Sequence, residues 1–422
     1  MTCKISLRTT VLWIGASATA TTAAPVFEVL SDVPTDVNHS FATSISANGE
    51  VVVGWNQSTV IQAYRWTALD GTQELGFLPG SPGHSSQAYG VSGDGLIVVG
   101  DVMSGGPTLA GRWNLFGGWL SLSPSASAAR GISANGLVIV GISSEVGAFR
   151  WTAPGGMVGL GQLRGGGPGS FPYAVSGDGS VIVGYGYTSL SQQEAFRWTD
   201  TTGMVGLGDL QGGAHVSVAY AVSANGEVVI GESISSNGNE AFRWTEADGM
   251  IGLGFLSGFT SSSVAKGVSA DGSVIVGRCV NNPASTADAF IWDAENGMRS
   301  LKGVLSSRSP QLANALALWE FEQAVGVSAD GRTIAGSGDG CDNPMRYRSW
   351  IVRLDSTELP AQGDLNCDGI INGVDLGILL AQWTILAGTE ACDGSQPCAY
   401  DFNADGAVNG IDLGILLANW TL

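Results

Sequence analysis

The strongest constraint on the fold is a repeat that recurs seven times between residues 26 and 355. Each copy holds four short β-type runs, best seen in "AYAVSANGEVVIG" at 219–231, "EAFRWT" at 194–199 and "GMVGLGDL" at 203–210. An Asn-Gly or Asp-Gly pair joins the first two runs, which is the strongest short signal for a β-hairpin. The glycine of that pair recurs at Gly49, Gly95, Gly136, Gly179, Gly226, Gly272 and Gly331.

Seven four-stranded units spaced 41 to 59 residues apart predict an all-β fold, a seven-bladed β-propeller over residues 25–355. The first run of each copy is built from small residues, which suits the crowded innermost strand of a blade. The chain then opens with a lone outer strand at 26–30, which we expect to pair with 349–354 and close the ring. A β-solenoid of the same repeats is the alternative, although its ends would need caps.

Composition and charge exclude several classes of partner. The chain has 18 Lys and Arg against 37 Asp and Glu, which gives a net charge of −19. So acidic a surface repels phosphate backbones and anionic lipids, and we expect no nucleic-acid partner. No segment is apolar over a length that would span a membrane. The 63 glycines and the low share of charged residues, 13%, favour a turn-rich β protein.

Residues 1–24 have the order of a secretory signal peptide. Lys4 and Arg8 precede a short apolar run around Val11 to Ile14, and small residues follow up to Ala24. We therefore expect the mature protein to be secreted, either extracellular or at the cell surface. Export allows disulfides, and Cys279 and Cys341 follow equivalent runs in neighbouring repeats, so they form the candidate pair.

Two twelve-residue loops near the C-terminus have the pattern of calcium sites. "DLNCDGIINGVD" at 364–375 is matched by "DFNADGAVNGID" at 401–412, and both place oxygen ligands at loop positions 1, 3, 5, 9 and 12 with Gly at position 6. A backbone carbonyl would supply position 7. Because residues 361–422 contain no Lys or Arg, folding of this segment should be coupled to calcium. The predicted ligands of two calcium ions are Asp364, Asn366, Asp368, Ile370, Asn372 and Asp375, then Asp401, Asn403, Asp405, Ala407, Asn409 and Asp412.

Each loop leads into an apolar helix, at 376–383 and at 413–420. A calcium loop followed by one helix, present twice, resembles a type I dockerin. The resemblance implies a small all-α domain of paired F-hands at 363–422 after a linker at 356–362, a cohesin-like protein as partner, and a link to polysaccharide catabolism. The partner-binding positions of that family fall on Gly373, Val374, Gly410 and Ile411, where apolar residues replace the hydroxyl-bearing residues of familiar dockerins.

The repeats themselves resemble the bacterial extracellular repeats called HAF repeats. Both share an A-F-x-W element, a G-x-x-x-L-G-x-L element and an A-x-x-[VI]-S-x-[DN]-G element over residues 26–355. The resemblance implies a repeat architecture and an exported protein, because that family has no settled activity.

One position in the repeat varies as a binding surface would. It lies three residues before the Ser of the first run and holds Thr43, Tyr89, Arg130, Tyr173, Tyr220, Lys266 and Val325. If the first run is innermost, these side chains face the central channel, where Tyr89, Arg130, Tyr173, Tyr220 and Lys266 would form a ligand site for carbohydrate. The alternative is that they pack between blades.

No catalytic residue is predicted. The sequence has no serine nucleophile elbow, phosphate loop or zinc signature, and its three histidines fall in different repeats. The Arg of the F-R-W element recurs in five repeats, which favours a structural role. Its copies are Arg65, Arg112, Arg150, Arg197 and Arg243.

The sequence therefore predicts an exported, non-catalytic binding or scaffold propeller, assembled through a calcium-dependent dockerin-like module. One alternative is a propeller enzyme, a glycoside hydrolase or lyase acting on extracellular polysaccharide. It would need two or more carboxylates in the channel mouth, whereas the repeats supply Asp mainly at hairpin turns. Another alternative is a structural surface protein.

Overall fold

The computed structural model describes most of the repeat region and parts of the C-terminal segment. The described residues are 26–30, 39–79, 85–103, 105–281, 286–308, 310–339, 347–354, 373–386, 400, 402, 408, 410–418 and 420.

The repeat region is almost entirely β. Its strands pair in antiparallel units of four, in the order that the repeat predicts. The first three units are β2 (His39–Ile45), β3 (Val51–Gln57), β4 (Ile61–Thr67) and β5 (Gly71–Glu74); β6 (Ser86–Val91), β7 (Ile97–Met103), β8 (Thr108–Asn114) and β9 (Gly118–Ser121); and β10 (Ser127–Ile132), β11 (Ile139–Ser143), β12 (Gly147–Thr152) and β13 (Gly156–Gly159).

The next three units are β14 (Ser170–Val175), β15 (Val181–Tyr187), β16 (Gln193–Thr199) and β17 (Gly203–Gly206); β18 (Gly212–Val222), β19 (Val229–Ser235), β20 (Gly238–Thr245) and β21 (Gly249–Gly252); and β22 (Ser262–Val268), β23 (Val274–Asn281), β24 (Thr286–Asp293) and β25 (Gly297–Ser300). A single parallel pair, Asn239 with Ser262, joins the last two of these into one eight-stranded sheet. The final unit is β26 (Glu320–Val327), β27 (Thr333–Asp339), β28 (Tyr347–Arg353) and β1 (Val26–Val29).

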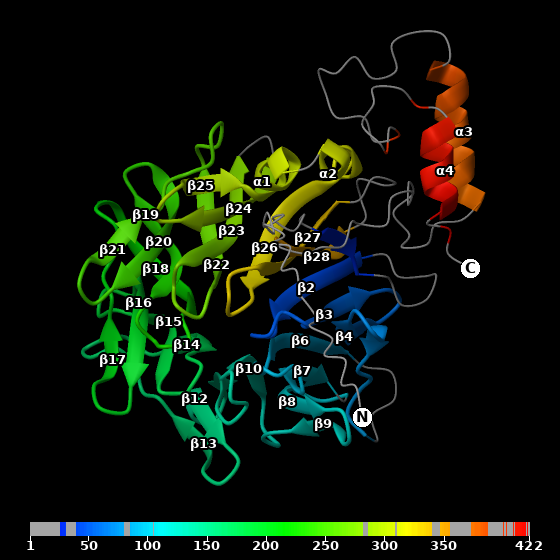
Figure 1. Ribbon diagram of the computed structural model, residues 1–422. Coiled ribbons are helices and arrows are strands. Elements are labelled where there is room, and N and C mark those ends of the chain that lie inside the picture. Colours follow the sequence, from blue (N-terminus) through cyan, green and yellow to red (C-terminus); the bar gives the residue numbers. More distant parts are fainter. Residues whose placement is uncertain are drawn as a thin grey trace, which may run out of the picture.

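The last unit combines the two ends of the repeat region. β1 pairs antiparallel with β28, with Val26 opposite Arg353 and Val29 opposite Trp350. The predicted pairing of the opening and closing strands is therefore confirmed. Figure 1 shows the units following one another around a common centre, from blue through green to yellow.

The hairpin turns of successive units are tied to one another by backbone hydrogen bonds. Asn48 N donates to Gly93 O at 3.3 Å and Gly93 N to Ala134 O at 2.9 Å, and the series continues through every unit. It returns to its start where Ala329 N of the last unit donates to Ala47 O of the first at 2.8 Å. The units thus form a closed ring. An open solenoid would have no such hydrogen bond between its first and last units.

Each hairpin turn is held by the Ser and the Asp or Asn of the S-x-[DN]-G element. In the second unit, the Ser92 hydroxyl donates to Asp94 Oδ1 at 2.6 Å and accepts from Ile97 N at 3.0 Å. Gly95 follows at φ 74°, a conformation that favours glycine. The hydrogen bond from Ser92, with that from Leu96 N, lowers the pKa of Asp94. The recurrent Asp residues are thus turn residues.

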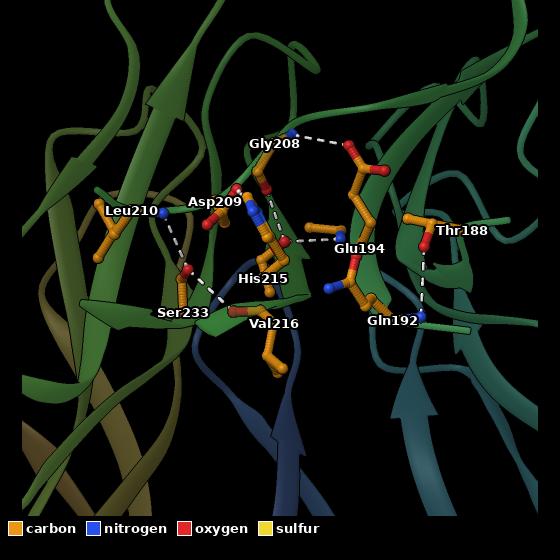
Figure 2. Close-up of polar contacts among 11 residues, drawn as sticks. Thr188, Gln192, Glu194, Gly208, Asp209, Leu210, His215, Val216 and Ser233 are labelled. Carbon is orange, nitrogen blue, oxygen red and sulfur yellow. Dashed lines mark hydrogen bonds and ion pairs between the residues drawn. The ribbon is translucent and has the colours of Figure 1, made fainter. Parts of the chain in front are cut away.

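Buried serine hydroxyls link neighbouring units. Ser86, Ser127, Ser217 and Ser263 lie on inner strands, and each Oγ accepts a hydrogen bond from the backbone N of an Ala in the preceding unit at 2.8 to 3.0 Å. Figure 2 shows contacts of the link that joins the fourth and fifth units, where Gly208 N donates to Glu194 Oε1 of β16 at 3.1 Å and Leu210 N donates to Ser233 Oγ of β19 at 3.0 Å. Satisfied polar groups at these junctions fix the units against one another.

Two short helices fill one junction. α1 (Leu301–Arg308) and α2 (Pro310–Ala315) precede β26, and Leu301, Leu305 and Leu312 join the apolar cluster that lies between the sixth and last units. In other junctions a leucine of the link between units occupies the cluster, for example Leu256. The insertion therefore extends the core.

The innermost strand of every unit contains a β-bulge. We call β2, β6, β10, β14, β18, β22 and β26 the inner strands, and their hydrogen-bonded neighbours β3, β7, β11, β15, β19, β23 and β27 the second strands. In β6 the ladder passes from Ala88 directly to Gly90, so Tyr89 is an extra residue without a partner on β7. The same shift occurs in all seven inner strands, and the extra residues, here called the bulge residues, are Thr43, Tyr89, Arg130, Tyr173, Tyr220, Lys266 and Val325.

A glycine on each second strand makes room for the bulge. A Cβ added at Gly100 would lie 1.9 Å from the carbonyl O of Gln87, and at the other six equivalent glycines it would lie 1.9 to 2.2 Å from an inner-strand carbonyl. Real Cβ atoms do not approach so closely, so any side chain there would force the inner strand away. These glycines are Gly54, Gly100, Gly141, Gly184, Gly231, Gly277 and Gly336.

The C-terminal segment contains two helices, α3 (Gly373–Leu386) and α4 (Gly410–Ala418). Leu379 of α3 and Leu416 of α4 are fully buried and form a small apolar cluster with Phe402. Most of the described residues of this segment are helical, in agreement with the predicted change of fold class after the repeats.

We expect the substitution Gly100→Ala to destabilise the protein, because the new methyl group would collide with the Gln87 carbonyl and no flexible side chain could yield. Overpacking of this kind costs about 1–3 kcal/mol in free energy of unfolding. Denaturant titration of both proteins measures the loss. Gly106→Ala is the matched control, because a Cβ there meets nothing within 4 Å; equal stability of the two variants would contradict the role of the glycine.

Candidate functional site

The bulge residues surround a single cavity of about 450 Å³. All seven line it, together with Phe41, Ala42, Trp55 and Gln323. The structure therefore brings together the five residues for which a channel ligand site was predicted, Tyr89, Arg130, Tyr173, Tyr220 and Lys266. A bulge redirects a side chain out of the regular alternation of a strand, which explains why one residue of each unit points away from the β core.

Val325 differs from the other bulge residues. It is partly buried and packs against the cluster formed by Leu30, Ala42 and Ile45. The Val325 side chain therefore packs partly between units, which was the alternative considered for these positions. The polar and aromatic bulge residues keep a half-buried surface toward the cavity.

Sequence reasoning missed a second layer of the site on the second strands. The residue that follows each spacing glycine differs from unit to unit: Trp55, Asp101, Ile142, Tyr185, Glu232, Arg278 and Ser337. Trp55 lines the cavity directly, while Asp101 and Glu232 bind neighbouring bulge residues. The signal for them was present, since this position varies while the glycine before it does not.

Aromatic rings form two walls of the cavity. Phe41 and Trp55 stack with their centroids 4.2 Å apart, and Tyr173 and Tyr220 lie 5.3 Å apart at 48°. Tyr185 supports Tyr173 from the second strand at 6.1 Å. Such flat, partly polar surfaces are the usual platforms for sugar rings and other planar or CH-rich ligands.

The two cations of the site have different partners. Arg130 Nη1 lies 3.0 Å from Asp101 Oδ2, and its guanidinium lies 4.4 Å from the centroid of the Tyr89 ring. Burial raises the pKa of Asp101, while the nearby Arg130 opposes that rise. Arg130 is therefore held in place by an ion pair and a ring.

Lys266 is held by a ring. Its Nζ lies 3.4 Å from the centroid of Tyr220, and among the described residues none accepts a hydrogen bond from it. The nearby Glu232 accepts from the Tyr220 hydroxyl at 2.5 Å and from Asn239 Nδ2 at 2.5 Å. Burial lowers the pKa of Lys266 to about 8, although the charge of Glu232 opposes this shift.

Carboxylates gather beside the cavity at the start of the last unit. Glu320 and Asp339 are cross-strand partners on β26 and β27, and Glu322 precedes the cavity residue Gln323. Burial, with the charges of Asp339 and Glu320, raises the pKa of Glu322 to about 7, and Arg278 opposes the rise. This group was not predicted, because it occurs in one unit alone and the repeat pattern does not mark it.

The recurrent Arg of the F-R-W element makes structural contacts. Arg65 Nε donates to Gly95 O at 3.1 Å and Arg197 Nε donates to Gly226 O at 3.3 Å, in each case across to the hairpin turn of the next unit.

Two histidines lie on separate units. His39 Nδ1 accepts a hydrogen bond from Tyr347 N. His215 pairs with Asp209, as Figure 2 shows. Within the described residues no three His, Cys, Asp or Glu side chains are placed to hold a metal.

Cys279 is a free, buried thiol, so the predicted disulfide with Cys341 is not present at this residue. Its Sγ accepts from Leu256 N at 3.5 Å and lies 3.5 Å from Met298 Sδ, inside an apolar cluster. Burial raises the pKa of the thiol to about 11. The side chain points into the core rather than along the surface; Cys341 lies outside the described residues.

Most of the predicted calcium ligands lie outside the described residues, and Asp375 and Asp412 at position 12 of each loop are the exceptions. Both are fully buried, and Asp412 Oδ1 accepts a hydrogen bond from Phe402 N at 2.6 Å. Burying carboxylates in a segment without Lys or Arg is costly unless a cation balances them, so these residues fit a calcium site. The predicted partner-binding residues begin the two helices and are exposed, with Val374 at 55% and Ile411 at 56%.

Comparison with known protein families decides the identity of this segment. Residues 362–419 match the dockerin type I domain. Type I dockerin domains bind calcium, occur on extracellular proteins and bind cohesin partners in assemblies. The dockerin resemblance seen in the sequence is therefore confirmed for this part of the chain, whereas no comparison supports the HAF resemblance of the repeats. No curated protein matches the chain.

Two solved structures have low similarity to this chain. TolB from Acinetobacter baumannii is 14% identical, with a TM-score of 0.41 over 74% of this chain and 83% of that one. An oligogalacturonate lyase in complex with manganese is 11% identical, with a TM-score of 0.47 over 79% of this chain and 98% of that one. Likenesses this low carry no argument about fold or function. Within the described residues, no helix is both long and apolar enough to cross a membrane.

We predict that Lys266 will react with lysine-acylating reagents at unusually low pH. The chain has three lysines, Lys4, Lys266 and Lys302, so peptide mass spectrometry can follow each one separately. With a pKa of about 8, the reactive neutral amine of Lys266 is formed above that pH, and its acylation rate should level off by about pH 9. A rate that keeps rising to pH 10, as for an exposed lysine, would contradict the burial of this side chain.

Proposed function

We propose that the protein is an exported binding module, in which a seven-bladed β-propeller presents a ligand site in its channel and a dockerin domain attaches it to a cohesin-bearing partner. In this proposal residues 1–24 are a signal peptide, 25–355 the propeller, 356–362 a linker and 363–422 the dockerin domain. The observation that carries the proposal is the dockerin match, because docking is the known task of that domain.

The ring supports the propeller assignment. Seven four-stranded units contact one another in sequence, and the last is completed by a strand from the start of the chain. This arrangement leaves the small inner strands around a common channel, with the bulge residues on its wall. A rigid ring with one variable residue per blade suits recognition, because its framework does not depend on which side chains face the ligand.

Two calcium ions are proposed for the dockerin domain, one in each loop. The six oxygen donors of each loop would include Asp375 or Asp412, whose burial at the start of a helix ties the loop to the apolar cluster of Leu379, Phe402 and Leu416. Bound calcium would supply two positive charges against the three carboxylates of each loop. With this charge offset, the two loops would become ordered and the two helices would keep one arrangement.

The two loops place equivalent residues on the docking surface. Val374 and Ile411 occupy the same loop position in the two copies, and both are exposed at the start of a helix. We propose that they contact the partner, together with Gly373 and Gly410. Since these residues are apolar or lack a side chain, the cohesin-like partner should offer an apolar rather than a hydroxyl-rich surface.

We expect calorimetry on the calcium-free full chain to detect two calcium ions. Asp368→Ala and Asp405→Ala should each remove one site, and the double variant should lose both sites together with capture by immobilised cohesin modules. Asp200→Ala, which changes an exposed residue of the repeats, is the control and should keep both. Absence of a calcium signal, or capture that survives the double substitution, would contradict the proposal.

An enzyme acting on extracellular polysaccharide is the second candidate function. The observation in its favour is the group formed by Glu320, Glu322 and Asp339, in which the raised pKa of Glu322, about 7, would suit a general acid. A hydrolase and lyase screen of the full chain, repeated with Glu322→Gln, distinguishes the two functions. The binding proposal expects no turnover from either protein.

A further inference from the structure

We propose that the cavity binds a sugar ring that carries a carboxylate, such as a uronic acid residue of a glycan, with Lys266 and Arg130 facing the carboxylate and the aromatic walls facing the ring. This inference rests on the proposed function, since it takes the channel as the ligand site. It adds the chemical class of the ligand.

Lys266 presents an ammonium group that is available to a ligand. Its ammonium reaches the cavity, stacks on Tyr220 and has no hydrogen-bond acceptor among the described residues. Glu232, the nearby carboxylate, is already engaged with Tyr220 and Asn239. A half-buried ammonium with free donors is stabilised by an anionic acceptor, which the ligand would supply.

Several charged side chains surround the cavity. Arg130 lines the cavity, and Arg278 of β23 is close enough to Lys266 for its charge to lower the pKa of that lysine. Asp101 balances Arg130, Glu232 lies near Lys266, and the charge of Arg278 also acts on Glu322 beside the cavity. Lys266 is therefore the cavity cation whose donors have no acceptor among the described residues, in a chain with a net charge of −19.

The size of the cavity and its aromatic faces suit a sugar ring. A volume of about 450 Å³ suits one or two sugar rings and is too small for a folded partner. The pairs Phe41–Trp55 and Tyr173–Tyr220 offer flat faces for the CH side of such a ring. A small aliphatic acid would leave these faces unused, and a long polyanion would be repelled by the acidic chain.

Two disaccharides that differ in one group test the inference. Cellobiuronic acid carries a carboxylate where cellobiose carries a hydroxymethyl group, and calorimetry on the calcium-loaded full chain compares their affinities. We expect the acid to bind at least tenfold more tightly, since a hydrogen bond to a charged group is worth about tenfold to a hundredfold in affinity.

Substitutions assign that difference to Lys266. Lys266→Met should remove the preference, so that the two sugars bind with similar affinity, while Lys266→Arg should retain the preference. Tyr173→Ala should weaken both sugars. Arg164→Gln, which removes an exposed cation outside the cavity, is the control and should change neither. Thermal unfolding of each variant establishes that it is folded.

The outcomes separate the two proposals. Equal affinity for both sugars, or a preference that survives Lys266→Met, would overturn the acidic-sugar inference while leaving the channel as a binding site. Failure of both sugars to bind would also overturn it, with calcium binding and docking unaffected. Binding of either sugar that is insensitive to Tyr173→Ala would place the ligand elsewhere and contradict the proposed channel site itself.

Discussion

The close approach of an inner-strand carbonyl to a glycine of the second strand is the contact on which the rest of the ring depends. It recurs in all seven units, at a distance that no side chain would allow. It gives the inner strand space for one extra residue, and that residue leaves the ladder and turns toward the channel. The same contact therefore shapes the crowded centre of the ring and creates its binding surface.

This arrangement separates stability from recognition. The turn serines, the junction serines, Arg65 and Arg197 bond to backbone groups, so their contribution is independent of what faces the channel. The bulge residues and the residues that follow the glycines make few such bonds, and they differ among the units. Aromatic rings and cations have gathered at these positions, in a protein that is otherwise acidic and poor in charge. The dockerin domain would attach this surface to a partner protein and would take no part in binding the channel ligand.

Much of the fold could be predicted because its signals are local and repeated. Asn-Gly and Asp-Gly pairs marked the hairpins, and the leftover runs at 26–30 and 349–354 predicted the closing pair of strands. The channel positions followed from the small size of the inner run. The dockerin loops were visible because calcium ligands follow one another within twelve residues.

What could not be predicted depends on register and on direction. One extra residue in a short strand leaves the repeat pattern unchanged, so the bulges at Tyr89 and Lys266 are invisible in sequence. The ion pair of Arg130 with Asp101 joins neighbouring units, and nothing in the spacing of the two residues along the chain indicates it. Cys279 was assigned to a disulfide by its place in the repeat, whereas its side chain points into the core between Leu256 and Met298.

A crystal structure of the full chain grown with calcium and cellobiuronic acid would test the ring, the cavity and the loops together. We expect a closed ring of seven blades, with the sugar in the cavity in contact with Tyr173, Tyr220 and Lys266, and calcium in both C-terminal loops. Inner strands that run without bulges, so that these side chains pack between blades, or a sugar bound outside the channel, would contradict it.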